Sequence, residues 1–441
     1  MLDISSNLNL FGSLPLSVWG NLNTGTSNLY SYYLDVSHNH ISGSLPAQIV
    51  YNQTVSMFVD ASHNNLSGNL PSNTAQNCVY GGFQWYLSDN FLSGQLLPGF
   101  VNNVTCSWIE TTYGKYATVS LQNNLLSGTL PESLGFLSGL RYLSLSGNNF
   151  SGSIPASLAN AKSLQFLDAS FNKLTGKIPS FGGDGTPYLW AIILRENELD
   201  GVIPPGVTNL TGLAVLDVSR NRLSGSIPFT RFITSDKSSL SPRNEAIADK
   251  ARWSALRLKQ ILANNGNVDV MGSLTDMSLN SFSQQDDLSV GFFSLNVSHN
   301  MLTGPIPKGL ANISKLEWLD LSHNQLTGTI PSELLQLTSL NSFNVSINPS
   351  LEGPIPQGAQ FYTFTNSSFI GNPDLCGPPL TKSCYSSAPV DPPEENPVNA
   401  TNSSLLSRIK EKVSLEAIGI GYAIGFMVVG YFFNHYFPYL R

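Results

Sequence analysis

Six aspartates and four histidines recur at fixed positions along this 441-residue chain, and their types are ones that can do chemistry. Paired carboxylates serve general acid–base catalysis, and His–carboxylate sets bind metals or sense pH. The residues are Asp3, Asp35, Asp60, Asp168, Asp217 and Asp320, with His38, His63, His299 and His323. Each set recurs because one position of a repeated motif recurs. We therefore interpret the aspartates as ordinary motif positions in one concave column and the histidines as solvent-facing repeat positions, and we predict that the protein is not an enzyme.

Composition excludes several other functions. The net charge of -7 argues against a nucleic-acid-binding surface, and 41% hydrophobic residues can build a substantial core. The sequence has no GxSxG, HExxH, P-loop or kinase signature. We therefore predict neither a cofactor nor a metal, and turn to the elements that repeat.

One motif recurs throughout the chain. In Leu316–Pro331 it reads LEWLDLSHNQLTGTIP, which corresponds to LxxLxLSxNxLxGxIP. The Asn of each copy stands at Asn7, Asn39, Asn64, Asn90, Asn124, Asn148, Asn172, Asn197, Asn221, Asn300, Asn324 and Asn348. Regular recurrence at this period is typical of a solenoid, in which each unit cannot bury its apolar face alone and stacks on the next.

The motif has a direct physical interpretation. Leu319 and Leu321 are two apart, so on a strand they point to the same side, and Asp320 points to the other. The Asn carries two donors and one acceptor on a short stem, so it can satisfy backbone groups left unpaired inside the turn. Gly tolerates positive φ and Pro lacks a donor, which lets the LxGxIP half turn the chain.

These residues resemble the plant-specific leucine-rich repeat, which is marked by the LxGxIP half. The resemblance implies a right-handed superhelix with a parallel sheet on the concave face and irregular or 3-10 coils on the convex face. It covers residues 1–228, with nine repeats of which the first is truncated, and residues 292–356, with three more.

The segment 229–291 interrupts the repeats. Ser241-Pro242 is a typical helix start, and the run to Ala263 predicts an amphipathic helix. Plant leucine-rich-repeat receptors often carry such an island, and in several it contributes to ligand binding. The alternatives are a tolerated surface insertion and a mispredicted exon.

The next segment, 357–386, resembles the C-terminal cap of plant receptor-like proteins and receptor kinases. The motifs are IPQGAQFYTF, then SFIGNPDLCGPPL, then Cys384. A solenoid's last coil exposes an apolar edge, which Phe361, Phe364 and Phe369 can cover. The resemblance also implies a Cys376–Cys384 disulfide that closes the cap.

Other features indicate an oxidising, extracellular compartment. Cys78 and Cys106 occupy nearly equivalent points on adjacent coils, within bridging range. A zinc site is the weaker alternative, because no His is nearby. Eleven glycosylation sequons stand at Asn52, Asn65, Asn103, Asn149, Asn209, Asn296, Asn312, Asn344, Asn366, Asn399 and Asn402.

Residues 387–416 are rich in Pro, Ser and Asn and are expected to form a juxtamembrane spacer. Residues 417–433 carry no charge, and with the aromatic residues that follow they predict a transmembrane helix over 417–437. Residues 438–441 would then be a short cytoplasmic tail. Ala417, Gly421 and Gly425 form a small-residue stripe that permits close helix packing.

Ligand binding is expected on the concave face. Aromatic residues that precede the inward strand residues are predicted to face solvent, accompanied by charged residues, and aromatics with Arg are typical of binding hot spots. The candidate ligand-binding residues are Arg141, Tyr142, Phe166, Trp190, Arg195, Glu196, Arg220 and Trp318.

Together these features resemble a plant receptor-like protein without a kinase domain. The resemblance implies a single-pass plasma-membrane protein with extracellular repeats, which binds a peptide, glycan or microbial ligand and signals through a partner receptor kinase. One alternative is an extracellular inhibitor or scaffold of the polygalacturonase-inhibitor type. The other is a truncated, non-functional receptor fragment, because no signal peptide or N-terminal cap precedes the first repeat.

Overall fold

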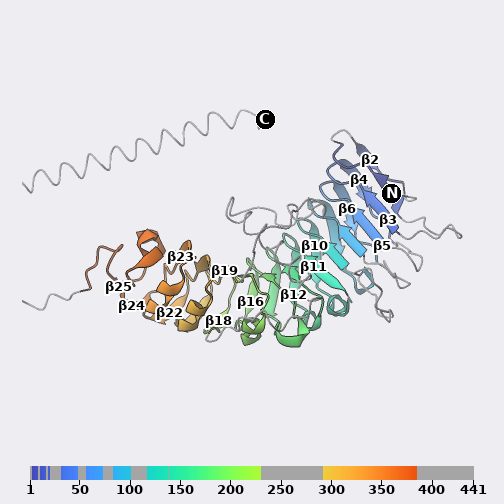
Figure 1. Cartoon of the computed structure of the whole chain (residues 1–441). Coiled ribbons are helices and arrows are strands. Elements are labelled where there is room, and N and C mark those ends of the chain that lie inside the picture. Colours follow the sequence, from blue (N-terminus) through green and yellow to red (C-terminus); the bar gives the residue numbers. More distant parts are fainter. Residues whose placement is uncertain are drawn as a thin grey trace, which may run out of the picture. The chain divides into compact units, whose positions relative to one another are not determined.

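The repeats form a stack of coils with one strand of a long sheet in each coil (Figure 1). The computed structural model describes residues 2–7, 10–15, 18–19, 31–47, 56–72, 83–100, 117–137, 139–229 and 292–384. Within these ranges the long sheet has twelve strands, all parallel to their neighbours. Strand β17 pairs directly with β19, so the coils on either side of residues 230–291 are adjacent. This is the parallel, solenoid-like arrangement that the repeat predicts.

The strands of the long sheet are, in order, β1 (Leu2–Asp3), β3 (Ser31–Asp35), β5 (Ser56–Asp60), β7 (Phe83–Tyr86), β9 (Ala117–Ser120), β11 (Leu140–Ser144), β13 (Phe166–Asp168), β15 (Ala191–Ile193), β17 (Val215–Asp217), β19 (Ser294–Asn296), β21 (Trp318–Asp320) and β23 (Ser342–Asn344).

The LxGxIP halves form two further parallel sheets. The second sheet comprises β2 (Phe11–Ser13), β4 (His40–Ser44), β6 (Asn65–Asn69), β8 (Phe91–Gln95), β10 (Leu125–Thr129), β12 (Asn149–Ser153), β14 (Lys173–Lys177) and β16 (Glu198–Asp200). The third sheet comprises β18 (Ser224–Gly225), β20 (Met301–Pro305), β22 (Gln325–Gly328), β24 (Ser350–Pro354) and β25 (Asp374–Cys376). The Gly of this half has positive φ, as at Gly152 with φ +73°, where an added Cβ would lie 2.9 Å from Thr129 Cγ2. A larger residue there would be strained in both backbone and packing.

Short 3-10 helices close the coils. They are η1 (Pro98–Phe100), η2 (Glu132–Phe136), η3 (Ala156–Asn160), η4 (Gly183–Gly185), η5 (Pro205–Asn209), η7 (Lys308–Asn312), η8 (Ser332–Gln336), η9 (Ala359–Thr363) and η10 (Asn366–Ser368). Several begin after the Pro of Ile-Pro, as η3 does after Pro155 and η8 after Pro331. Proline suits this place because the first turn leaves its N–H groups unpaired anyway.

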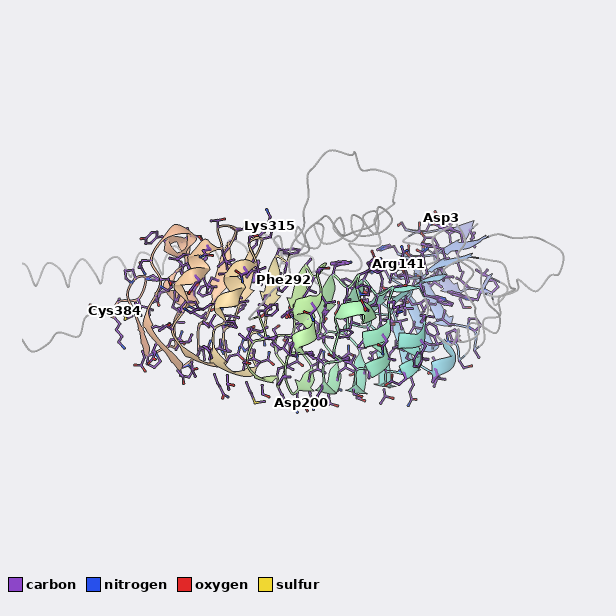
Figure 2. All side chains as sticks on the ribbon, turned by 60° about the horizontal axis from the view of Figure 1, so that its bottom comes forward. Asp3, Arg141, Asp200, Phe292, Lys315 and Cys384 are labelled. Atoms are coloured by element: carbon purple, nitrogen blue, oxygen red, sulfur yellow. A yellow bond between two sulfur atoms is a disulfide. The ribbon has the colours of Figure 1, made fainter. Side chains whose placement is uncertain are left out.

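The core lies between these layers, where side chains fill the interior of the stack (Figure 2). The alternation within each strand is as predicted: Leu319 and Leu321 are fully buried, and Asp320 between them is half-buried on the other side. Leu126 and Leu158, from the turning half and a 3-10 helix, are also fully buried. One continuous apolar core therefore runs through all coils.

The repeated Asn residues form a hydrogen-bonded ladder. Asn172 Nδ2 donates to the carbonyls of Leu145, Ala169 and Ser170 at 2.9, 3.3 and 3.0 Å. Its Oδ1 accepts the backbone N–H of Phe150 in the preceding coil at 2.9 Å. The predicted role of the ladder is confirmed, because the amide of Asn172 satisfies backbone groups of two coils.

The predicted cap covers the end of the core. Phe361, Phe364 and Phe369 are buried against Phe343, with ring centroids 5.0–5.9 Å apart. The predicted Cys376–Cys384 disulfide is present, with the two Cα atoms 5.0 Å apart. Both predictions for the cap are confirmed.

Other predictions fall outside the described residues. These are the 242–263 helix, the Cys78–Cys106 pair, the spacer, the span 417–437 with its Ala417, Gly421 and Gly425 stripe, and the tail 438–441. In the ranges that the structure does describe, no helix has the length and apolar character needed to cross a membrane.

Candidate functional site

The recurring aspartates are turn-stabilising residues. Asp168 Oδ1 accepts the Ser170 N–H at 2.9 Å and the Ser170 hydroxyl at 2.6 Å, and Asp320 makes the same pair of bonds with Ser322. Asp168 is 6% exposed, and burial raises its pKa to about 6 despite these hydrogen bonds. Their side chains are therefore committed to the chain's own turns.

The recurring histidines pair across adjacent coils. The rings of His38 and His63 stack with centroids 4.2 Å apart, and those of His299 and His323 with centroids 3.9 Å apart. All four have φ of 52–54°, because they occupy the left-handed position directly before the ladder Asn. Burial and the neighbouring His323 and Arg220 lower the pKa of His299. Among the described residues, no cluster of three His, Cys, Asp or Glu can hold a metal ion.

Tyr142, Phe166 and Trp318 lie on the side of the long sheet opposite the core, which we call the outward face. The other candidate residues lie in or next to strands of the same sheet. Arg141 and Tyr142 belong to β11, Phe166 to β13 and Trp318 to β21. Figure 2 shows Arg141 at one edge of the stack and Asp200, from the second sheet, at the opposite edge. The structure brings Tyr142, Phe166 and Trp190 together, with ring centroids 6.3 and 5.4 Å apart along this series.

The prediction that Phe166 and Trp190 face solvent is wrong. Their exposed fractions are 0% and 1%, and they belong to a second apolar cluster. The other members of this outward cluster are Ala191, Ile193, Ala214, Val215 and Phe293, with Tyr142 packed against it. The cause is that neighbouring strands here all place apolar side chains on the outward face, where most coils have polar ones.

Sequence reasoning missed the smaller members of the outward cluster. A signal was present: in residues 189–194, LWAIIL, apolar residues occupy both faces of the strand instead of alternating with polar ones. A strand that is apolar on both faces indicates burial on both faces.

Charged residues border the outward cluster. Arg220 Nε and Glu196 Oε1 form an ion pair at 3.1 Å. The Arg195 guanidinium lies 4.8 Å from the centre of the Phe171 ring, a cation–π arrangement. Arg195 Nε and Trp190 Nε1 are buried donors that lack a hydrogen-bond partner in the described structure. An unpaired buried donor lowers stability, because it has lost its hydrogen bonds to water.

Trp318 stands apart from this group. It is 41% exposed, and Ser294 of β19 lies between it and Val215 in the row of paired residues across the sheet. The outward face therefore offers a half-buried charged and aromatic zone around Arg195 and a separate exposed tryptophan. This arrangement can bind a ligand through charge, hydrogen bonds and aromatic contact, but it brings no nucleophile and base together.

The seven sequons within the described residues divide into two groups. Asn65, Asn149, Asn209, Asn312 and Asn366 are exposed on strand or helix ends outside the long sheet. Asn296 and Asn344 end strands of the long sheet and are half-buried, with Oδ1 of each accepting a backbone N–H two residues on. Asn52, Asn103, Asn399 and Asn402 lie outside the described residues.

Two family models match the repeats. A leucine-rich-repeat model matches residues 117–174, and a second matches residues 293–313 and 315–337. Each match covers coils whose strands and ladder are described above. This chain has leucine-rich repeats. The comparison with curated proteins gave no match.

Solved structures of plant receptor ectodomains are similar to this chain. The ectodomain of the Arabidopsis thaliana receptor kinase GASSHO1/SCHENGEN3, in complex with CASPARIAN STRIP INTEGRITY FACTOR 2, is 27% identical with a TM-score of 0.50, over 87% of this chain and 42% of that one. The Arabidopsis HAESA ectodomain, with an IDA peptide hormone, is 25% identical with a TM-score of 0.43, over 87% and 63%. The plant peptide hormone receptor RGFR1, with RGF2, is 27% identical with a TM-score of 0.42, over 85% and 59%. The chain is thus similar in fold to a plant receptor-kinase ectodomain, and it spans less than two thirds of the length of each of these three chains.

Proposed function

We propose that this protein is a cell-surface receptor-like protein that binds an extracellular ligand on the outward face and signals through a partner receptor kinase. The observation that carries the proposal is the similarity, at a TM-score of 0.50, to a receptor-kinase ectodomain solved with its ligand. This similarity covers 87% of the chain. The ligand class is a peptide, a glycan or a microbial molecule.

The proposed contacts are those candidate residues that a ligand can reach. Arg220 and Trp318 are exposed, and Arg141, Tyr142, Arg195 and Glu196 are half-buried. Phe166 and Trp190 support the surface from beneath, since both are buried. An exposed tryptophan and arginines are residue types that dominate binding energy at interfaces. We assign the protein a binding role and no catalytic one.

We propose that residues 417–437 anchor the chain in the plasma membrane with the repeats outside. The charge-free run 417–433 supports this. A protease added to intact cells should then remove the repeats, and repeats that survive digestion would contradict the proposed orientation.

The test of ligand-dependent signalling is co-precipitation of receptor kinases with the full chain from plant membranes, with and without added apoplastic fluid. Fluid should increase the kinase recovered with the wild type. The variant Arg195→Ala/Arg220→Ala/Trp318→Ala should lose this increase, because it removes contacts but no core side chain. The control variant Lys173→Ala/Glu352→Ala changes exposed residues of the second and third sheets and should respond like the wild type. An unchanged response in the triple variant would contradict the proposed site.

Association with the kinase has its own test. Gly421→Leu with Gly425→Leu should abolish co-precipitation if the small-residue stripe packs against the partner helix, while membrane insertion persists because Leu is apolar. Unchanged co-precipitation would instead favour the last three repeats, 292–356, as the contact surface.

A further inference from the structure

An exposed apolar pair lies between two sequons on the second sheet. Four successive strands of that sheet, β6, β8, β10 and β12, begin with Asn65, Phe91, Leu125 and Asn149. Phe91 is 55% exposed and Leu125 is 52% exposed, and both asparagines are exposed as well. Along this edge of the sheet, a sequon Asn is therefore followed by two large apolar residues and then by a second sequon Asn.

The strand register places each sequon close to one member of the pair. Phe91 pairs with Ser67, which lies two residues after Asn65 and therefore points to the same side. In the same way Asn149 pairs with Ser127, which shares its side with Leu125. Neighbouring strands are about 4.8 Å apart. Each sequon Asn is thus the diagonal neighbour of a large apolar side chain on the adjacent strand, two residues out of register and on the same surface.

Serines share this surface with the apolar pair. Ser93 and Ser127 donate their hydroxyls to the carbonyls of Gly68 and Gly94 at 3.5 and 3.4 Å, so these side chains turn toward the sheet. Phe91 and Leu125 are larger than these serines and more than half exposed. A pyranose ring has a C–H face that packs on apolar and aromatic side chains, where it meets the negative face of the aromatic ring.

We propose that the N-linked glycans of Asn65 and Asn149 lie across this platform and cover Phe91 and Leu125. The first sugar of each glycan is attached beside one member of the pair, so the contact needs no ordering of a distant chain. This inference rests on the proposed extracellular placement, which supplies the glycans. It makes the two glycans part of the folded structure, unlike those on the 3-10 helices.

The experiment uses the full chain expressed in plant cells, with sequon occupancy determined by mass spectrometry. Asn65→Gln/Asn149→Gln should lower the melting temperature of the repeats by about 1–3 °C, because it uncovers the apolar pair. In a Phe91→Ser/Leu125→Ser background the same Gln substitutions should have no such effect. The control Asn209→Gln/Asn312→Gln removes glycans from the ends of η5 and η7 and should leave the melting temperature unchanged.

Several results would overturn the inference. One is an equal loss of melting temperature in both backgrounds, and another is no loss although Asn65 and Asn149 are occupied. A wild-type dimer in sedimentation that Phe91→Ser dissociates would make a second copy the occupant. Glycans at Asn209 and Asn312 but not at the pair would refute this inference alone. Glycans at none of these sites would refute the extracellular placement as well.

Discussion

Replacing Asp168 with Asn should stabilise the protein at neutral pH. Burial raises the pKa of Asp168 from 3.8 to about 6, so the folded protein holds this proton more tightly than the unfolded chain does. The stability that this tighter proton binding contributes is fully present below pH 3.8 and is lost as the pH rises through about 6. A shift of about two units corresponds to about 3 kcal/mol of lost stability at pH 7. Asn removes this penalty because it is neutral.

The hydrogen bonds should survive the substitution. Asn296 occupies the same position of its own coil, and its Oδ1 accepts the N–H and hydroxyl of Ser298 at 3.1 and 2.8 Å, as Asp168 does with Ser170. The expected outcome is an Asp168→Asn variant more stable by about 1–3 kcal/mol at pH 7 and equal to the wild type near pH 4.

Urea unfolding of both proteins at several pH values measures this difference. Asp320→Asn is the matched control, because Asp320 makes the same bonds but is half-buried. That control should change stability little at any pH. The reasoning would be refuted by an Asp168→Asn variant no more stable than the wild type at pH 7, or by a difference that persists unchanged at pH 4.

Three further predictions concern the ladder, the cap and the histidine pairs. Asn172→Ala leaves the Phe150 N–H without its amide partner, whereas the Leu145 carbonyl keeps its bond from Asn148 Nδ2. The cost should be about 1–3 kcal/mol, and hydrogen exchange at Phe150 should accelerate; unaltered protection there would contradict the ladder's role. Opening the Cys376–Cys384 disulfide, which spans a sequence separation of 8, should destabilise the cap by about 2.5 kcal/mol, as measured by exchange across 355–384 with and without reductant. His323→Asn should raise the pKa of His299, because burial and the neighbouring His323 lower it in the wild type. The folded protein therefore favours neutral His299, and the stability present above pH 6.5 is lost as the pH falls and this side chain is protonated. An NMR titration of His299 that is identical in both proteins would show that the pair is not coupled.

Periodic features of the fold were predictable from the sequence. The strand alternation around Leu319, the ladder at Asn172 and the capping phenylalanines all repeat or terminate one motif. Each depends on contacts within a coil or with an identical neighbour, so a one-dimensional pattern contains the information. The same reasoning placed Arg195, Glu196 and Arg220 near one another on adjacent coils, where Glu196 and Arg220 form an ion pair.

The outward face was less predictable. The position of Phe166 varies in burial from coil to coil: Tyr142 is half-buried there and Trp318 is 41% exposed. Whether such a side chain is buried depends on what adjacent coils place beside it, here Ala191, Val215 and Phe293 among others. That combination is particular to one stretch of the stack and is not part of the motif.

By itself the sequence determined the solenoid, its period, its buried ladder and its capped end, because these follow from local residue preferences repeated coil after coil. Only the tertiary structure decided which variable side chains meet. It stacked His299 on His323, buried Phe166 and Trp190, and set the stagger that places Asn65 beside the strand of Phe91. These outcomes depend on the geometry between coils, because the register and separation of neighbouring strands determine the contacts, and residue type alone does not specify them.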